Sequence, residues 1–150
     1  MSRELKFALV GAGFIGRSHA LAIHAVNHVF ADAALTARAF IVAESTEARA
    51  RDAAQKLGFE AFTASWEEAV EKADAVIVAV PSNLHARVAS RAIEAGKAVL
   101  CEKPVGLSSA EAAQLAASAT AAAKGMRSRT TCGPIPPALV PRRCVSASTR

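Results

Sequence analysis

One apolar run limits the folds open to this chain more than any other feature. Residues 74–81, DAVIVAVP, form a continuous run rich in β-branched side chains. A strand of this kind is buried on both faces, which is typical of a parallel sheet covered by helices on each side. The run therefore predicts an inner strand of an α/β fold.

The chain alternates strand-like and helix-like segments five times. Strands are predicted at residues 5–11, 40–44, 59–62, 74–81 and 97–103. Helices are predicted at residues 14–30, 45–58, 65–72, 83–96 and 108–125. This alternation indicates parallel βαβ units with right-handed crossovers, so we expect a doubly wound sheet with helices on both faces. Ligands of such sheets bind at the carboxyl ends of the strands.

A glycine motif follows the first predicted strand and opens the first predicted helix. Residues 11–16, GAGFIG, match G-x-G-x-x-G in the context that a Rossmann dinucleotide site requires. Gly11 permits the tight turn, Gly13 lets a pyrophosphate approach the backbone, and Gly16 allows close helix–strand packing. Phe14 and Ile15 begin the helix, whose free N–H groups attract phosphate. We predict that all five residues bind a dinucleotide; the alternative is a plain glycine-rich turn.

Glu44 ends the second predicted strand, where an acid can bind the ribose hydroxyls of an adenosine. Its charge repels a 2′-phosphate, so NAD is favoured over NADP as cofactor. Ser45 and Arg49 keep NADP open as the alternative, because both can bind a phosphate. The motif usually places this acid roughly 20 residues after the glycines. Here the distance is longer, and we interpret residues 27–39 as a lengthened connection.

A turn follows the inner strand at residues 80–85, VPSNLH. Pro81 stops the strand, and Asn83 can cap the next helix. In a doubly wound sheet this turn lies beside the nicotinamide ribose, so we assign cofactor contacts to its members. They are Val80, Pro81, Ser82, Asn83 and His85. A simple capping turn is the alternative interpretation.

The last predicted strand ends in CEKPVG, residues 101–106. An acid, a base and a proline follow an apolar run, and the segment is either a solvated turn or a catalytic edge. Cys101 is interpreted as a small apolar residue. His19, three residues after Gly16, is interpreted as a packing residue.

Composition narrows the classes of protein further. With 150 residues and 52% hydrophobic residues, the chain fits one globular domain, and no apolar run approaches a membrane helix. No signal peptide is recognisable, so a cytoplasmic location is expected. Three cysteines without C-x-x-C spacing support neither a disulfide framework nor a metal site.

The net charge of +5 is unevenly distributed along the chain. Residues 1–125 hold 13 of the 18 basic residues and all 13 acidic residues, so they balance. The excess lies in residues 126–150, and a nucleic-acid partner is not predicted. These residues also contain four of the six prolines and show no periodicity. They are either a basic extension or, as we prefer, a stretch read out of frame, which sequencing of the locus tests.

The glycine motif with its helix, GAGFIGRSHA, and the segment PSNLHARVASRAIEAGKAVLCEKPVGLSSAEA together resemble one family. It is the glucose–fructose oxidoreductase/inositol dehydrogenase (Gfo/Idh/MocA) family, over about residues 5–125. The resemblance implies an NAD(P)-binding domain of a sugar or inositol dehydrogenase that acts on a small sugar or polyol. It also implies that Lys103, in the EKP motif, faces the nicotinamide and assists catalysis, with Glu102 beside it.

Family members carry a second α/β domain that supplies the substrate pocket and a catalytic histidine. Residues 126–150 are too short and irregular to provide it, so we expect it to be absent from this sequence. Three hypotheses remain: an oxidoreductase by descent, a non-catalytic NAD-binding module, and an inactive truncated or frameshifted fragment. An exposed docking face would also favour self-association.

Overall fold

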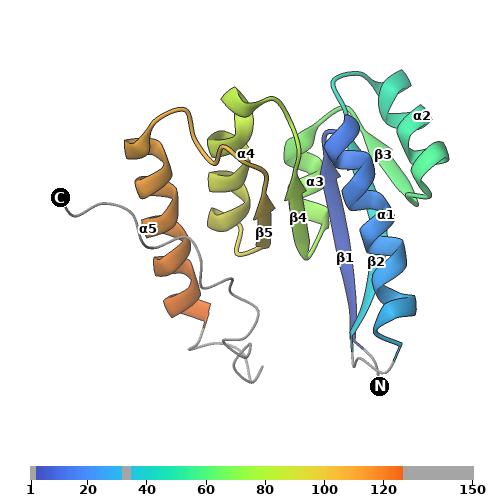
Figure 1. The fold of residues 1–150 in the computed structure, drawn as a ribbon, viewed down its shortest axis with the longest axis horizontal. Coiled ribbons are helices and arrows are strands. Elements are labelled where there is room, and N and C mark those ends of the chain that lie inside the picture. Colours follow the sequence, from blue (N-terminus) through green and yellow to red (C-terminus); the bar gives the residue numbers. More distant parts are fainter. Residues whose placement is uncertain (1–2, 32–34, 127–150) are drawn as a thin grey trace.

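The computed structural model describes residues 3–31 and 35–126, which form one parallel sheet flanked by helices (Figure 1). The strand order is β3-β2-β1-β4-β5, which is the doubly wound arrangement predicted from the sequence. The elements in chain order are β1 (Arg3–Val10), α1 (Phe14–Val29), β2 (Leu35–Ala43), α2 (Glu47–Leu57), β3 (Ala61–Thr63), α3 (Trp66–Lys72), β4 (Ala75–Val78), α4 (Ser82–Glu94), β5 (Ala98–Cys101) and α5 (Ser109–Met126).

The strand β4 confirms the prediction made from its apolar run. All four of its residues are buried, and β4 pairs in parallel with β1 on one side and β5 on the other. β5 pairs with β4 and ends the described sheet, so its other edge faces outward. Within the described residues, the buried strand β4 therefore lies next to an edge strand that is paired on one side.

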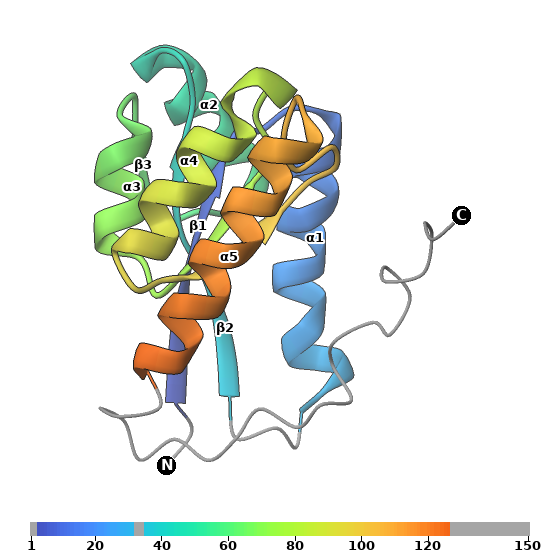
Figure 2. The ribbon, with the colours of Figure 1, turned by 90° about the vertical axis from the view of Figure 1, so that its left-hand side faces the viewer.

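Two apolar cores cover the two faces of the sheet. On one face, α1 and α2 contribute Ile23 and Ala53 to a cluster with Leu9 and Val42. On the other face, helices α3, α4 and α5 contribute the buried residues Val70, Val88 and Leu115. Figure 2 shows α3 and α1 on opposite sides of β1 and β2. Because all strand pairs are parallel, the carboxyl ends of the strands lie at one edge of the sheet, where the connections to the helices begin.

The connection between α1 and β2 is shorter than the sequence suggests. α1 runs to Val29 and β2 begins at Leu35, so most of residues 27–39 lies in regular structure. The side chain of Asn27 bridges the main chain of Ala37: its Nδ2 donates to the carbonyl at 2.7 Å, and its Oδ1 accepts from the amide at 2.8 Å. This amide bridge fixes the helix against the strand, so the predicted lengthened loop is wrong.

Three helices begin with a side-chain cap, whereas α4, for which Asn83 was the predicted cap, does not. Thr46, Ser65 and Ser108 each accept a backbone N–H from the first turn of their helix. Asn83 does not cap α4, because the helix begins one residue earlier and Pro81 occupies the cap position without a side-chain bond.

The C-terminal helix ends slightly later than predicted, since α5 continues through Gly125 to Met126. The irregular stretch predicted for residues 126–150 therefore overlaps α5 at Met126. The remainder of that prediction, residues 127–150, lies outside the described part of the chain. Among residues 3–31 and 35–126, no helix has the length and apolar character needed to cross a membrane.

Candidate functional site

A cleft of about 640 Å³ opens at the carboxyl ends of β1, β2 and β4, beside the exit of β5. This volume is in the usual range for small-molecule and cofactor sites. The cleft brings together most of the residues that the sequence nominates. Those that line it are Gly11, Gly13, Phe14, Ile15, Glu44, Ser45, Arg49, Val80, Pro81, Ser82, His85, Glu102 and Lys103. Gly16 and Asn83 are the two predicted residues that are absent from its lining.

The glycine loop between β1 and α1 has one residue in the left-handed region. Gly11 has φ of 93°, and a Cβ there would lie 2.5 Å from the carbonyl oxygen of Ala79. A Cβ on Gly16 would lie 2.1 Å from the carbonyl oxygen of Gly11. Both glycines are therefore required by packing, as the motif predicts.

Gly13 has a different reason to lack a side chain. A Cβ built on Gly13 meets no atom within 4 Å, so protein packing does not require glycine here. Gly13 also precedes α1 as its N-cap and offers no side-chain oxygen to the first-turn N–H groups. Space beside the backbone together with a helix start that has no side-chain cap fits the approach of a pyrophosphate.

Glu44 binds the glycine loop at the end of β2. Its Oε1 accepts the backbone N–H of Ala12 at 2.8 Å, and its Oε2 accepts the N–H of Ser45 at 3.1 Å. The Arg49 guanidinium lies 3.4 Å from Oε2, and the Glu44 side chain is only 11% exposed. A carboxylate has about four acceptor sites, so Glu44 retains capacity for ribose hydroxyls. Glu44 thus lies at the end of β2, where the sequence analysis predicts a residue that binds the adenosine ribose.

The turn after β4 directs one predicted residue inward. His85 is 2% exposed, and its Nδ1 and Nε2 each lie 2.7 Å from a backbone carbonyl oxygen, of Pro104 and Val80 respectively. A neutral imidazole carries one N–H, so it donates to one of these carbonyls at a time. His85 therefore links the β4–α4 turn to the segment after β5, while it also lines the cleft.

The segment after β5 carries Glu102 and Lys103 into the cleft. The N–H of Glu102 donates to the Val78 carbonyl at 3.0 Å, which extends the pairing of β4 and β5 beyond the strand. Glu102 Oε1 lies 2.7 Å from His19 Nε2 on α1, and this hydrogen bond lowers the pKa of the Glu102 carboxyl. Lys103 is exposed at the same end of the cleft.

Two residues of this region have roles that sequence reasoning did not assign. His19 binds Glu102 and is more than a packing residue. Trp66 lines the cleft beneath the Arg87 guanidinium, which lies 5.4 Å from its ring centroid. His19 could have been noticed in the sequence from its position on α1, one turn after Gly16. For Trp66 the signal was its position at the start of α3.

The described residues contain no candidate metal-binding site. No group of three or more His, Cys, Asp or Glu side chains converges within residues 3–31 and 35–126. Cys101 ends β5, where partial burial raises the pKa of its thiol above the ordinary value. This placement agrees with its interpretation as a small apolar residue at a strand end.

Comparison with known proteins decides the family. The Gfo/Idh/MocA family model, described as an oxidoreductase family with an NAD-binding Rossmann fold, matches residues 5–128. The chain belongs to the Gfo/Idh/MocA family. The matched residues include the glycine loop, the β4–α4 turn and the EKP segment, so the cleft is that of an NAD-binding Rossmann domain.

Relatives within the Gfo/Idh/MocA family include sugar and inositol dehydrogenases. Levoglucosan dehydrogenase of Pseudarthrobacter phenanthrenivorans is 37% identical over 105 residues, which are 69% of this chain and 27% of that protein. Inositol 2-dehydrogenase of Rhizobium meliloti is 40% identical over 103 residues, which are 69% of this chain and 29% of that protein.

Similarity to a sugar dehydrogenase is also found among solved structures. Levoglucosan dehydrogenase in complex with NADH and levoglucosan matches with a TM-score of 0.76 and 32% identity, over 79% of this chain and 32% of that one. The 150 residues therefore span about a third of the length of the Gfo/Idh/MocA proteins that they match.

Proposed function

We propose that this chain is the NAD-binding part of a dehydrogenase that oxidises a CH–OH group of a sugar or polyol. The observation that carries the proposal is one continuous cleft with Gly13 and Glu44 near one end and Lys103 at the other. Two matched relatives, a levoglucosan dehydrogenase and an inositol 2-dehydrogenase, support this class of substrate. A cytoplasmic location remains a prediction, which cell fractionation tests.

The adenosine half of the cofactor is assigned to the end formed by β1 and β2. The backbone at Gly13 and the first turn of α1 receive the pyrophosphate, because they have open space and N–H groups without a side-chain cap. Glu44 accepts the ribose hydroxyls, and its negative charge opposes a 2′-phosphate. We therefore propose NAD as the preferred cofactor. Ser45 and Arg49 supply the NADP alternative, because Arg49 already approaches the Glu44 carboxylate.

The nicotinamide half is assigned to the turn after β4 and the segment after β5. Val80, Pro81 and Ser82 line this part of the cleft and flank the nicotinamide ribose. The exposed ammonium of Lys103 orients the reacting C–OH group and stabilises the negative charge that develops on its oxygen. NAD, when bound, accepts the hydride from that carbon. Lys103 is the one residue to which we assign a catalytic role.

We propose further that these 150 residues bind NAD without turning over a substrate by themselves. The supporting observation is that the chain spans about a third of its relatives, 27% of one and 29% of another. Two histidines near the cleft are already engaged, His19 by Glu102 and His85 by backbone carbonyls. Neither is therefore a free general base for the substrate hydroxyl.

Calorimetric titration of the chain with NADH tests the binding proposal. We expect saturable binding at one site, and weaker binding of NADPH. Absence of NADH binding by a folded chain would leave the inactive-fragment hypothesis. Incubation with NAD and myo-inositol or levoglucosan tests the second proposal, with NADH formation followed by absorbance. Robust turnover would contradict it. Sequencing of the locus downstream of codon 126 decides whether the following residues are read out of frame.

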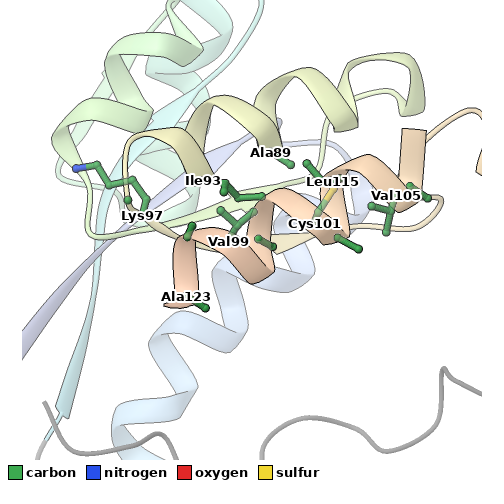
Figure 3. A pocket seen from close by; sticks show the side chains of 13 residues that line it. Ala89, Ile93, Lys97, Val99, Cys101, Val105, Leu115 and Ala123 are labelled. Carbon is green, nitrogen blue, oxygen red and sulfur yellow. The ribbon is translucent and has the colours of Figure 1, made fainter. Parts of the chain in front are cut away.

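Self-association through the open edge of β5 is a separate proposal. An apolar groove of about 470 Å³ lies between α4, β5 and α5, and Figure 3 shows Ile93, Val99, Leu115 and Val105 among its lining. The strand AVLC carries no charge, and Leu100 on it is 52% exposed. The unpaired N–H and C=O groups of an uncharged edge can serve as a template for another strand. A second copy offers an identical edge, so twofold antiparallel pairing satisfies both.

Sedimentation velocity over a concentration series tests this self-association. We expect a dimer whose population rises with concentration, and Leu100→Lys should return the chain to a monomer. Phe62→Lys is the matched control, because Phe62 is 37% exposed on β3, the strand at the opposite edge of the sheet. A wild-type chain that stays monomeric at high concentration would contradict the proposal.

A further inference from the structure

One side-chain hydrogen bond beside the cleft joins two segments that are distant in the sequence. His19 lies on α1 one turn after Gly16, and Glu102 follows β5, which is 83 residues later in the chain. His19 Nε2 and Glu102 Oε1 are 2.7 Å apart, and their side chains are 21% and 25% exposed. An ionised carboxylate only accepts hydrogen bonds, so His19 Nε2 is the donor.

The second oxygen of the same carboxylate acts on the neighbouring residue. Glu102 Oε2 accepts the backbone N–H of Lys103 at 3.3 Å. The ring of His19 therefore controls the orientation of a carboxylate that also holds the main chain of Lys103. A rotation of the Glu102 side chain would release both contacts together.

The chain is held on the far side of Lys103 as well. The carbonyl oxygen of Pro104 lies 2.7 Å from Nδ1 of the buried His85. The main chain is thus contacted on both sides of the Lys103 side chain. The Glu102 carboxylate, itself bonded to His19 on α1, accepts the Lys103 N–H, and the His85 ring on α4 lies against the Pro104 carbonyl. The Lys103 side chain itself remains exposed in the cleft.

The His19–Glu102 contact contributes little to fold stability, because ion pairs with partly exposed side chains are worth little. Its placement suggests another purpose. Catalytic and binding groups need their geometry held by supporting hydrogen bonds, since small displacements carry large losses. The ring of His19 is such a support, delivered by the helix whose N-terminus receives the pyrophosphate.

We propose that His19 is a positioning residue that acts through Glu102 to fix Lys103 at the nicotinamide end of the cleft. The proposal rests on the function assigned to Lys103 above. It predicts that the occupied glycine loop and the lysine are coupled through α1, although β4 lies between β1 and β5 in the sheet.

The first measurement uses the chain without cofactor. Backbone ¹H–¹⁵N NMR follows the amide of Lys103 in wild type, His19→Ala and His19→Gln. We expect His19→Ala to shift the Lys103 amide, and His19→Gln to restore most of the wild-type position, because glutamine keeps a side-chain N–H donor. His24→Ala is the matched control on the same helix, since His24 bonds the Leu57 carbonyl instead. It should leave the Lys103 amide unchanged.

The second measurement follows the fluorescence of bound NADH, which reports the surroundings of the nicotinamide. Lys103→Met, His19→Ala and the double variant form a cycle. If His19 acts through Lys103, the two single variants change the emission in the same direction, and the double variant changes it no further than Lys103→Met. Calorimetry should show that His19→Ala retains NADH binding through the glycine loop.

The outcomes separate this proposal from the proposed function. An unchanged Lys103 amide in His19→Ala would overturn the positioning role, whether or not NADH binds. Additive emission changes in the cycle would also overturn it, while leaving the proposed function intact. Failure of the wild-type chain to bind NADH would remove the proposed function, and the amide measurement would still decide whether His19 positions Lys103.

Discussion

The two ends of the cleft are built in different ways. At the adenosine end, the backbone of the glycine loop and one carboxylate, Glu44, form the contacts, and Glu44 is already bonded to Ala12. At the nicotinamide end, the Lys103 side chain is exposed, and the hydrogen bonds hold the Lys103 N–H and the Pro104 carbonyl. The first end consists of backbone and a carboxylate that is already hydrogen-bonded, whereas the second presents an exposed side chain. Under the proposed function, cofactor binding and substrate chemistry would therefore depend on different parts of the cleft.

The largest expected effect comes from the glycine loop. Gly16→Ala places a Cβ 2.1 Å from the Gly11 carbonyl oxygen, so we expect a loss of about 1–3 kcal/mol in the free energy of unfolding and loss of NADH binding. Gly13→Ala is the matched variant, because its Cβ meets no atom within 4 Å. It should retain stability in urea unfolding and still weaken NADH in calorimetry. Unchanged NADH affinity in Gly13→Ala would remove the pyrophosphate contact from our assignment.

The next effect separates the adenosine end from the nicotinamide end. Glu44→Ala removes the acceptor of the Ala12 amide, and we expect NADH to bind about tenfold more weakly, with NADPH favoured relative to wild type. Glu47→Ala is the control, because Glu47 is exposed and pairs with Arg51 on the surface of α2. Calorimetry with both nucleotides gives the ratio. An unchanged ratio would contradict the proposed role of Glu44 in cofactor choice.

At the nicotinamide end, we expect a third and smaller effect, which concerns the pKa of Glu102 and the stability that depends on it. The hydrogen bond from His19 holds the pKa of Glu102 below its ordinary value of 4.5. Because the pKa is lowered, the small stability that this contact contributes is fully present above that ordinary value. The contribution is lost as the pH falls through the lower folded pKa. Titration of the Glu102 carboxyl by ¹³C NMR should show its pKa rising in His19→Ala, and an unchanged value would show that the His19 contact is not its cause.

The smallest expected effects concern the helix starts on the two sides. Thr46 caps α2 at the adenosine end, so Thr46→Ala should lower the free energy of unfolding by about 1 kcal/mol. α4 at the nicotinamide end has no side-chain cap, and Asn83→Ala should change stability by less than about 0.5 kcal/mol. Thermal unfolding by circular dichroism compares the two. An equal loss in both variants would mean that Asn83 caps α4 after all.

Local patterns predicted the fold well because each rests on short-range physics. The apolar run of β4 requires cover on both faces, and the alternation of segments then fixes a parallel sheet. Gly11 and Gly16 follow from the same reasoning, since their motif combines a strand end with a helix start. The cap residue of α4 failed because the turn after Pro81 closes one residue earlier than the side-chain pattern implies.

Side-chain contacts between distant segments could not be predicted in this way. Nothing local to His19 identifies Glu102 as its partner, because their meeting depends on the arrangement of the three strands and three helices that lie between α1 and β5 in the chain. The bridge from Asn27 to Ala37 is a similar case, since a loop and a long strand give the same local pattern. The sequence therefore nominated the cleft residues and missed the bonds that orient them.

The hydrogen bond from Glu102 to Val78 has a consequence for local opening of the molecule. It connects the EKP segment to β4, whose residues are all buried. Amides held by core strands exchange with solvent only when large parts of a protein open, whereas exposed segments exchange readily. The Glu102 amide should therefore exchange as slowly as the core, while the neighbouring Lys103 amide exchanges faster. The main-chain pairing with the core thus ends at Glu102, and the next amide, that of Lys103, depends on the Glu102 carboxylate instead.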